Sequence, residues 1–160
     1  MLRTLHEALL QDEGSADRFC TVCCGLLRLS DARIEMSLSC GGHPLPIVAR
    51  ATGEVQTVEC RGTLLGLRGP VKLQDQTIRL DAGDVVVLFT DGAIEAHRST
   101  TDLFGEERLA EIIGASASLS ADEIADRILS AVVAFGPSEP RDDIAIVVAK
   151  LRPEGAAASV

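Results

Sequence analysis

The sequence predicts an α+β fold in which antiparallel sheet carries helices on its outer faces. Short apolar runs follow one another through tight turns, one of these runs is apolar without a break, and segments with helical periodicity bracket them. The chain has 160 residues, of which 46% are hydrophobic and 24% charged. These values are typical of one globular domain with one core.

Two neighbouring segments form a predicted hairpin. Residues 18–29 are rich in apolar and β-branched side chains, and residues 33–39 alternate apolar with polar ones, as a half-buried strand does. A turn at residues 30–32 joins them. Further strands are predicted around Ile47 and Val48, at residues 55–58, at Gln76–Leu80 and at residues 144–151.

The run Val85–Phe89 is predicted to be a central strand. Its five residues are all apolar, which is typical of a strand that is covered on both faces. It ends directly in Thr90, Asp91 and Gly92.

Three segments have helical character. Residues 2–10 place Leu2, Leu5, Leu9 and Leu10 on one face, and residues 106–113 are expected to form a helix ended by Gly114. Ser120 and Glu123 form a capping box that opens a helix to about residue 135. Its predicted buried stripe consists of Ile124, Ile128, Leu129, Val132 and Val133. Residues 152–160 are expected to be a disordered tail.

The charge balance disfavours nucleic acid as a partner. Lys and Arg number 15 and Asp and Glu number 24, so the net charge is −9, and no basic run offsets it. No apolar run approaches the roughly 18 residues of a membrane span, and the first residues do not have the pattern of a signal peptide. We therefore expect a cytoplasmic protein with no membrane partner.

The five cysteines are expected to be reduced. Their odd number argues against a disulfide framework in a chain of this size. Cys20 and Cys23 form a C-x-x-C pair, but they lie in a strand-like segment, whereas a redox motif opens a helix. A zinc site would need a second ligand pair. Packing in the core is the favoured interpretation.

Acidic residues lie at the margins of two apolar strands. Asp91 follows Val85–Phe89, and Asp142 with Asp143 precedes the last strand. Carboxylates that converge at strand ends can bind Mg²⁺ or Mn²⁺, and two such ions can promote phosphate-ester hydrolysis. The alternatives are a turn at Asp91 and Gly92 and a solvated loop at Asp142 and Asp143.

Taken in order, several segments resemble one family. CGGHPLPIVARATGEV, LDAGDVVVLFTDGAIEA, LFGEERLAEII and RDDIAIVVAKL are similar to motifs of the SpoIIE/RsbU-like branch of the protein phosphatase 2C (PPM) superfamily. The resemblance covers about residues 18–151. It implies an antiparallel β-sandwich flanked by helices, the PPM-type phosphatase fold, incomplete at the N-terminus, with residues 1–151 forming a partial domain.

The resemblance also implies an activity. Members of this branch hydrolyse phosphoserine or phosphothreonine at a two-metal Mn²⁺ or Mg²⁺ centre, so Asp91 and Asp142 would be catalytic metal ligands. Gly92 would allow a close backbone approach, and Asp143 would have a supporting role. The expected substrate is a phosphorylated regulatory protein, such as an anti-sigma-factor antagonist of the STAS type. An upstream sensor region or a homodimer is a further expectation.

One family motif is missing from this sequence. The G-D-(F/Y)-x-D loop, whose aspartate bridges both metals in the family, does not occur. Two carboxylates cannot hold two divalent ions as four can. The metal site of this chain is therefore expected to be incomplete, and the alternative function is a catalytically silent, phosphatase-like module that binds a partner protein.

Overall fold

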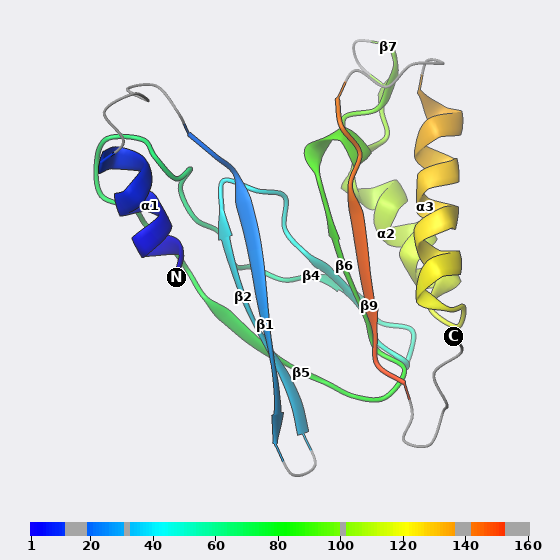
Figure 1. The fold of residues 1–160 in the computed structure, drawn as a ribbon. Coiled ribbons are helices and arrows are strands. Elements are labelled where there is room, and N and C mark those ends of the chain that lie inside the picture. The colour runs from blue at the N-terminus through cyan, green and yellow to red at the C-terminus, as the bar shows by residue number, and fades with distance from the viewer. Residues whose placement is uncertain (12–18, 31–32, 100–101, 137–141, 153–160) are drawn as a thin grey trace. The chain divides into compact units, whose positions relative to one another are not determined.

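The computed structural model describes residues 1–160 except 12–18, 31–32, 100–101, 137–141 and 153–160 (Figure 1). Within it the chain divides into two compact units. The first comprises residues 1–45 and 58–79, and the second comprises residues 46–57 and 80–160. The predicted tail lies, apart from Arg152, outside the described residues, and the predicted domain extent of 1–151 stays a prediction.

An antiparallel hairpin forms the main part of the first unit. β1 (Val22–Ser30) pairs with β2 (Arg33–Gly41), and β5 (Gln76–Leu80) completes a sheet in the order β1-β2-β5. The predicted hairpin and the predicted strand at Gln76–Leu80 are confirmed. β1 begins four residues later than predicted, since Cys20 instead forms an isolated bridge with Leu65. Residues 31–32 of the predicted turn lie outside the described residues.

The helix α1 (Leu2–Gln11) also belongs to the first unit, and its predicted apolar face is only partly buried. Leu2 is buried, but Leu5 and Leu10 are exposed. His6 is buried instead, and its Nδ1 accepts the backbone N–H of Gly66 at 3.2 Å. A polar contact therefore holds a helix whose sequence pattern indicated apolar packing.

The second unit is built on a four-stranded antiparallel sheet. β3 (Ile47–Ala49), β4 (Val55–Thr57), β6 (Val85–Phe89) and β9 (Ile146–Lys150) are arranged in the order β4-β3-β6-β9. In β6, Val85, Val86 and Val87 are all fully buried, although consecutive residues of a strand point to opposite faces. The prediction of a central strand covered on both faces is confirmed.

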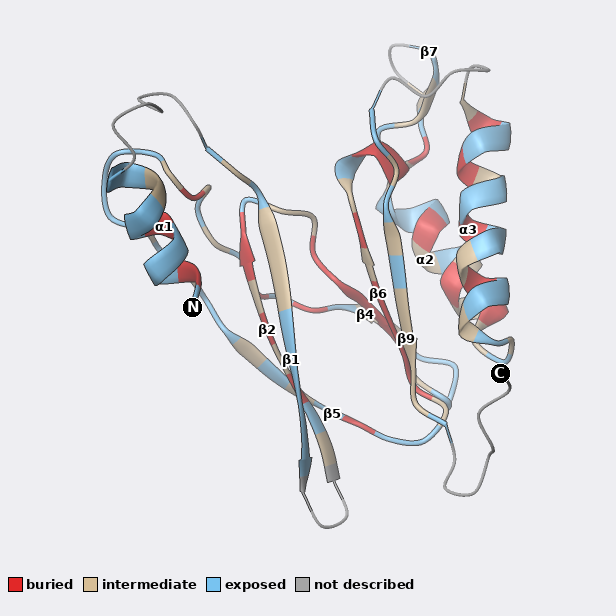
Figure 2. Cartoon of the chain, in the orientation of Figure 1, coloured by how far each residue is buried: buried red, intermediate tan, exposed pale blue. Residues whose placement is uncertain are grey.

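Two helices cover one face of this sheet (Figure 1). They are α2 (Gly105–Ser116) and α3 (Ala121–Phe135), and the sides that they bury face the strands (Figure 2). α3 begins with the predicted capping box, in which the backbone N–H groups of Ser120 and Glu123 each donate to the other residue's side chain. The core between helices and sheet is aliphatic apart from Phe89, Phe104 and Phe135.

The buried stripe of α3 is narrower than predicted. Ile124, Ile128 and Val132 are buried, at a spacing of four residues, but Leu129 and Val133 are 43% and 47% exposed. The prediction that these last two are buried was wrong. They follow the stripe by one position, about 100° around the helix, which takes them past the edge of the contact with the sheet.

Gly114 does not end the preceding helix, contrary to prediction, because α2 continues to Ser116. A Cβ atom at Gly114 would lie 2.9 Å from Cγ2 of Val55 in β4. The glycine therefore permits a close approach of helix and strand, at the cost of some helix propensity.

The end of the chain and two short elements complete the second unit. β9 begins at Ile146, two residues after the predicted start, because Ala145 is still bonded to Thr90 in the loop before the strand. The sequence did not indicate β7 (His97–Ser99) and β8 (Asp102–Leu103), which pair with each other. In the described part of the chain no helix has the length and apolar character needed to cross a membrane.

Candidate functional site

Asp91 lies where the central strand ends. After Phe89 and Thr90 the chain enters a short 3-10 helix, η1 (Asp91–Ala93), closed by backbone hydrogen bonds from Ile94 and Glu95 to the carbonyl oxygen of Asp91. Gly92 and Ala93 are buried, whereas Asp91 is exposed. Its Oδ1 accepts the backbone N–H of Gly92 at 3.1 Å. The strand and the buried turn thus fix the backbone that carries the Asp91 carboxylate.

The loop with Asp142 and Asp143 is tied to this strand end by Thr90. The Thr90 hydroxyl donates to the carbonyl oxygen of Asp143 at 2.8 Å and accepts the backbone N–H of Ala145 at 2.9 Å. The Thr90 N–H in turn donates to the carbonyl oxygen of Ala145 at 3.0 Å. These contacts join two segments that are 53 residues apart.

Gly92 lies directly against the same loop. A Cβ atom at this position would be 2.6 Å from the carbonyl oxygen of Asp143 and 3.3 Å from that of Asp142. Real Cβ atoms essentially never approach an atom to 2.6 Å, so any side chain would push the loops apart. Its φ is not positive, and it is the absence of a side chain that matters here.

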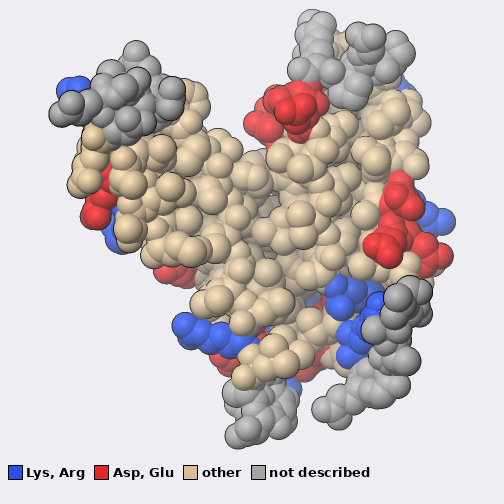
Figure 3. Space-filling view, in the orientation of Figure 1, with Lys and Arg blue, Asp and Glu red and all other residues tan. Residues whose placement is uncertain are grey.

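Acidic side chains therefore gather at one end of the sheet, where β6 ends and β9 begins (Figure 3). Asp91, Asp142 and Asp143 are all exposed there. Like Asp91, Asp142 accepts the backbone N–H of the following residue through Oδ1, at 2.8 Å. The structure thus brings the loops of the predicted ligands together.

Carboxylate oxygens are the hard donors that Mg²⁺ and Mn²⁺ prefer. Among the described residues, however, no group of three or more His, Cys, Asp or Glu side chains is placed to hold a metal ion. The donor chemistry at this end of the sheet fits a divalent cation, but these residues supply only part of a coordination shell.

A different acid, Asp84, has a structural role at the opposite end of β6. It is 2% exposed, and its carboxylate accepts hydrogen bonds from Arg50 Nη1 at 2.8 Å, Ala51 N at 2.9 Å and Asp81 N at 3.0 Å. Burial alone raises the pKa of Asp84, but the backbone donors of Asp81 and Ala51 and the Arg50 guanidinium together hold the pKa below its ordinary value. Asp84 anchors the turn before the central strand.

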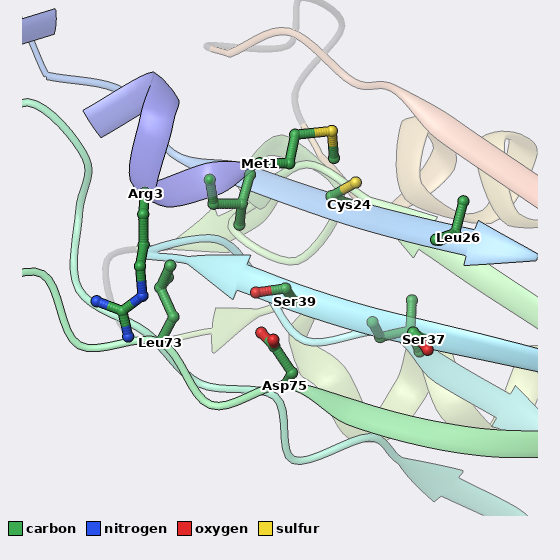
Figure 4. Close-up of a pocket in the computed structure, with 10 residues that line it drawn as sticks. Met1, Arg3, Cys24, Leu26, Ser37, Ser39, Leu73 and Asp75 are labelled. Atoms are coloured by element: carbon green, nitrogen blue, oxygen red, sulfur yellow. The ribbon is translucent and has the colours of Figure 1, made fainter. Parts of the chain in front are cut away.

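The first unit contains a cavity that no sequence motif indicated. It has a volume of about 310 Å³ and lies between the start of α1, β1 and β2 (Figure 4). Arg3, Cys24, Ser37, Ser39 and Asp75 line it together with apolar residues. Ser39 Oγ is buried without a hydrogen-bond partner. Such a cavity is made by the packing of segments far apart in sequence, so no local motif predicts it.

The match to a known family covers nearly the whole chain. The sequence model of the family Stage II sporulation protein E (SpoIIE) matches residues 1–152. The chain belongs to the SpoIIE family. The family resemblance predicted from the motifs is thereby confirmed.

One curated relative of this SpoIIE family member is Protein IcfG of Synechocystis sp., which is 23% identical over 147 residues. These residues are 91% of this chain but 23% of the relative, so the chain spans about a quarter of that protein.

Solved structures of the same kind agree on the fold. The phosphatase domain of SpoIIE from Bacillus subtilis (Mn presoaked) has a TM-score of 0.71 at 17% identity, covering 98% of this chain and 76% of that one. The structure of the RsbU and RsbW domains of Rv1364c from Mycobacterium tuberculosis has a TM-score of 0.76 at 23% identity. The match covers 94% of this chain and 41% of that one. The SiaA-PP2C domain of Pseudomonas aeruginosa has a TM-score of 0.70 at 19% identity, and the match covers 94% of this chain and 59% of that one. The predicted α+β class with antiparallel sheets, of the PP2C phosphatase type, is confirmed.

Proposed function

We propose that this chain forms the larger part of a metal-dependent protein phosphatase domain that hydrolyses phosphoserine or phosphothreonine. The observation that carries the proposal is the junction of the Asp91 loop with the Asp142 loop, held by the Thr90 hydroxyl and by the backbone contact of Gly92. A fold alone does not fix a function, but this junction supplies exposed carboxylates at the end of a rigid buried strand. Family membership supports the same activity.

In this proposal Asp91 and Asp142 are the catalytic metal ligands. Both carboxylates are exposed, on backbone segments that a buried strand and a shared hydroxyl hold in place. Gly92 has a supporting role because it lets the two loops touch. Asp143 supports the site because its carbonyl oxygen accepts the hydrogen bond of the Thr90 hydroxyl. Two bound divalent ions would supply an acidified water and stabilise the charge of the phosphoryl group.

The chain alone offers too few ligands for full activity. No G-D-x-x-D motif occurs in the sequence, and no group of three candidate ligands is present among the described residues. Mg²⁺ gives up its hydration shell reluctantly, so a pair of carboxylates binds it weakly. A longer polypeptide that supplies this motif would complete the site.

For the substrate we propose a phosphorylated regulatory protein, such as an anti-sigma-factor antagonist of the STAS type. Support comes from the structure of Rv1364c, in which an RsbU domain and an RsbW domain belong to one protein. The net charge of −9 also favours a protein substrate over a nucleic acid. An upstream sensor region or a homodimer belongs to the same proposal.

The incomplete ligand set favours a second candidate, a phosphatase-like module that binds its partner without hydrolysing it. One experiment separates the two. A phosphoserine peptide and about 1 mM Mn²⁺ are added to the 160-residue chain and, separately, to a chain extended upstream through a G-D-x-x-D motif. The phosphate that each chain releases is measured.

We expect the extended chain to hydrolyse the peptide and the 160-residue chain to release phosphate near the background rate. Asp91→Asn in the extended chain should abolish turnover, whereas Asp122→Asn, at an exposed position in the first turn of α3, should not. Peptide binding without turnover by the extended chain would favour the silent module.

A further inference from the structure

Three thiols that the proposed phosphatase reaction does not use meet in the first unit. Cys40 Sγ donates to Cys23 Sγ at 3.3 Å and lies 3.2 Å from Cys60 Sγ. Cys23 is on β1, Cys40 near the end of β2, and Cys60 in the segment after β4. We refer to these three residues as the thiol cluster.

The backbone sets the separations within the thiol cluster. Cys23 lies directly opposite Cys40 in the register of β1 and β2. The backbone N–H of Cys40 donates to the carbonyl oxygen of Cys60 at 3.1 Å, so that segment also lies alongside β2. Residues directly opposite each other in an antiparallel pair have Cα atoms about 4.5–5.5 Å apart, which falls inside the range of roughly 4.4–6.8 Å seen for disulfides.

The three thiols differ in access to solvent. Cys40 and Cys60 are 1% and 0% exposed, and Cys23 is half-buried. The hydrogen bond from the Cys40 thiol lowers the pKa of Cys23, whereas its hydrogen bonds to Cys23 and Cys60 raise the pKa of Cys40. The hydrogen bond with Cys40 also lowers the pKa of Cys60, but Cys60 is fully buried. Thiolates are the reactive form of cysteine, so Cys23 combines a lowered pKa with the best access.

A metal does not explain the cluster, because the described residues contain no group of three His, Cys, Asp or Glu side chains placed to hold an ion. All five cysteines are free. The contacts between the thiols therefore represent either inert packing or a reduced dithiol.

We propose that the thiol cluster is a site of reversible oxidation, in which Cys40 is the shared partner of a single disulfide with either Cys23 or Cys60. Each bond needs the two sulfur atoms to approach from just over 3 Å to about 2.05 Å. The backbone pairing already allows it. Cys40 stands between the other two, so one disulfide can form at a time and one thiol remains.

A peroxide is the oxidant that this chemistry requires. The Cys23 thiol gives up its proton, and the thiolate attacks one oxygen of hydrogen peroxide. The O–O bond breaks, a sulfenic acid forms, and the released hydroxide takes up the proton as one water. The Cys40 thiol then attacks the Cys23 sulfur, the S–O bond breaks, and the proton leaves with hydroxide as a second water. Two thiols have lost two electrons and two protons, and the peroxide has gained them.

The bond can then move by exchange. The Cys60 thiolate attacks the Cys40 sulfur, Cys23 leaves as a thiolate, and the disulfide now joins Cys40 to Cys60. That disulfide is fully buried, whereas Cys23 returns to the half-exposed thiol form. A dithiol reductant returns either disulfide to two thiols by the same kind of exchange and is itself oxidised to a disulfide.

The test treats the reduced 160-residue chain with a small excess of hydrogen peroxide. We expect the loss of two of the five free thiols, a mass lower by about 2 Da and full reversal by dithiothreitol. Trypsin separates the cluster into peptides 19–28, 34–50 and 51–61, which hold Cys23, Cys40 and Cys60 respectively, and peptide 19–28 also holds Cys20 and Cys24. Without reduction, peptide 34–50 should be linked to one of the other two.

Matched variants decide which thiols take part. Cys24 is the neighbour of Cys23 on β1 but lines the cavity, where Figure 4 shows its side chain. Cys24→Ser should therefore oxidise like the unchanged chain. Cys40→Ser should form no intramolecular disulfide, and Cys60→Ser should keep the link between peptides 19–28 and 34–50.

Three results of the peptide mapping would overturn the proposal. They are addition of oxygen to the native chain without any linked peptides, a disulfide confined to peptide 19–28, and linked peptides in Cys40→Ser. The map of the unchanged chain does not depend on whether that variant folds, and circular dichroism of each variant checks its fold. Disulfides that form only in urea would identify the cluster as inert packing.

Discussion

The hydroxyl group of Thr90 donates a hydrogen bond to the carbonyl oxygen of Asp143 at 2.8 Å. It also accepts the backbone N–H of Ala145 at 2.9 Å. Thr90 directly precedes Asp91, and Asp143 directly follows Asp142, so this side chain fixes how the backbones of the two proposed ligands lie. The candidate site thus depends on a residue that binds no metal in the proposal.

Replacing Thr90 by valine keeps the shape of the side chain but removes both hydrogen bonds. The carbonyl of Asp143 and the N–H of Ala145 lose their partner, so the free energy of unfolding should fall by about 1–3 kcal/mol. Urea unfolding measures the change. Thr90→Ser keeps the hydroxyl and should lose clearly less; an equal loss in both variants would assign the effect to the missing methyl group.

Gly92→Ala should separate the two loops. The new Cβ would meet the Asp143 carbonyl oxygen at 2.6 Å, and the resulting shift should cost roughly 1–3 kcal/mol of unfolding free energy. Gly136→Ala is the control, because its Cβ would lie 3.8 Å from the nearest atoms, which is ordinary contact. Equal stability of both variants would show that the loops separate at no cost.

Asp84 should make stability depend on pH in the acid range. Its folded-state pKa is lowered, so its contribution is fully present above the unfolded-state pKa of about 3.9 and is lost as the pH falls through the folded-state pKa. Asp84→Asn should therefore be destabilised near neutral pH, and the gap to the unchanged chain should narrow below about pH 4.

The control for this measurement is Asp126→Asn, at an exposed position on α3. Its curve of stability against pH should follow that of the unchanged chain. If the gap between Asp84→Asn and the unchanged chain were constant from pH 7 to the acid range, the assigned role of the Asp84 charge would be wrong.

Val87→Asp should be severely destabilising. Val87 is 0% exposed at the centre of β6, and a buried, unpaired carboxylate costs several kcal/mol, on the order of 4. Val147 is the matched position, since it lies on the neighbouring strand β9 but is 59% exposed. Val147→Asp should cost less than about 1 kcal/mol by chemical denaturation. Similar losses in the two variants would contradict the buried position of β6.

The sequence predicted those helices and strands that depend only on residues close together in the chain. The unbroken apolar run of Val85–Phe89 predicted a central strand, and Ser120 with Glu123 predicted where α3 begins, because both patterns act within a few residues. The exposure of Leu129 and Val133 could not be predicted, since it depends on how far the sheet extends beneath α3. The helix through Gly114 likewise depends on Val55, a residue of another strand.

The residues of the candidate site could be named from the sequence, and their role stays a prediction, but the contacts between them could not be predicted. Asp91 and Asp142 were named from their positions at the margins of apolar strands. The hydrogen bonds of the Thr90 hydroxyl depend on the register of β6 against β9, which no local pattern specifies. The same holds for the thiol cluster, where Cys20 and Cys23 suggested a pair by spacing, but the contacts join Cys40 to Cys23 and Cys60.

Mn²⁺ should stabilise this chain only slightly. A ligand that binds the folded state alone raises the free energy of unfolding by RT ln(1 + [L]/Kd). With two exposed carboxylates as ligands we expect a Kd on the order of 1 mM, so about 1 mM Mn²⁺ adds about 0.4 kcal/mol. A complete site with a Kd of about 1 µM would gain about 4.1 kcal/mol under the same conditions. The measurement is urea unfolding of the 160-residue chain, once with Mn²⁺ and once with EDTA.

The same titration on a chain extended through a G-D-x-x-D motif should give the larger gain. In that longer chain Asp91→Asn should remove most of the gain, because a ligand is lost without a change of shape, whereas Asp122→Asn should leave it intact. The readout is stability, so it tests metal binding even if the peptide used to assay turnover is a poor substrate. If Mn²⁺ raised the free energy of unfolding of the 160-residue chain by several kcal/mol, and this gain persisted in Asp91→Asn, both the ligand assignment and the incomplete site would be contradicted.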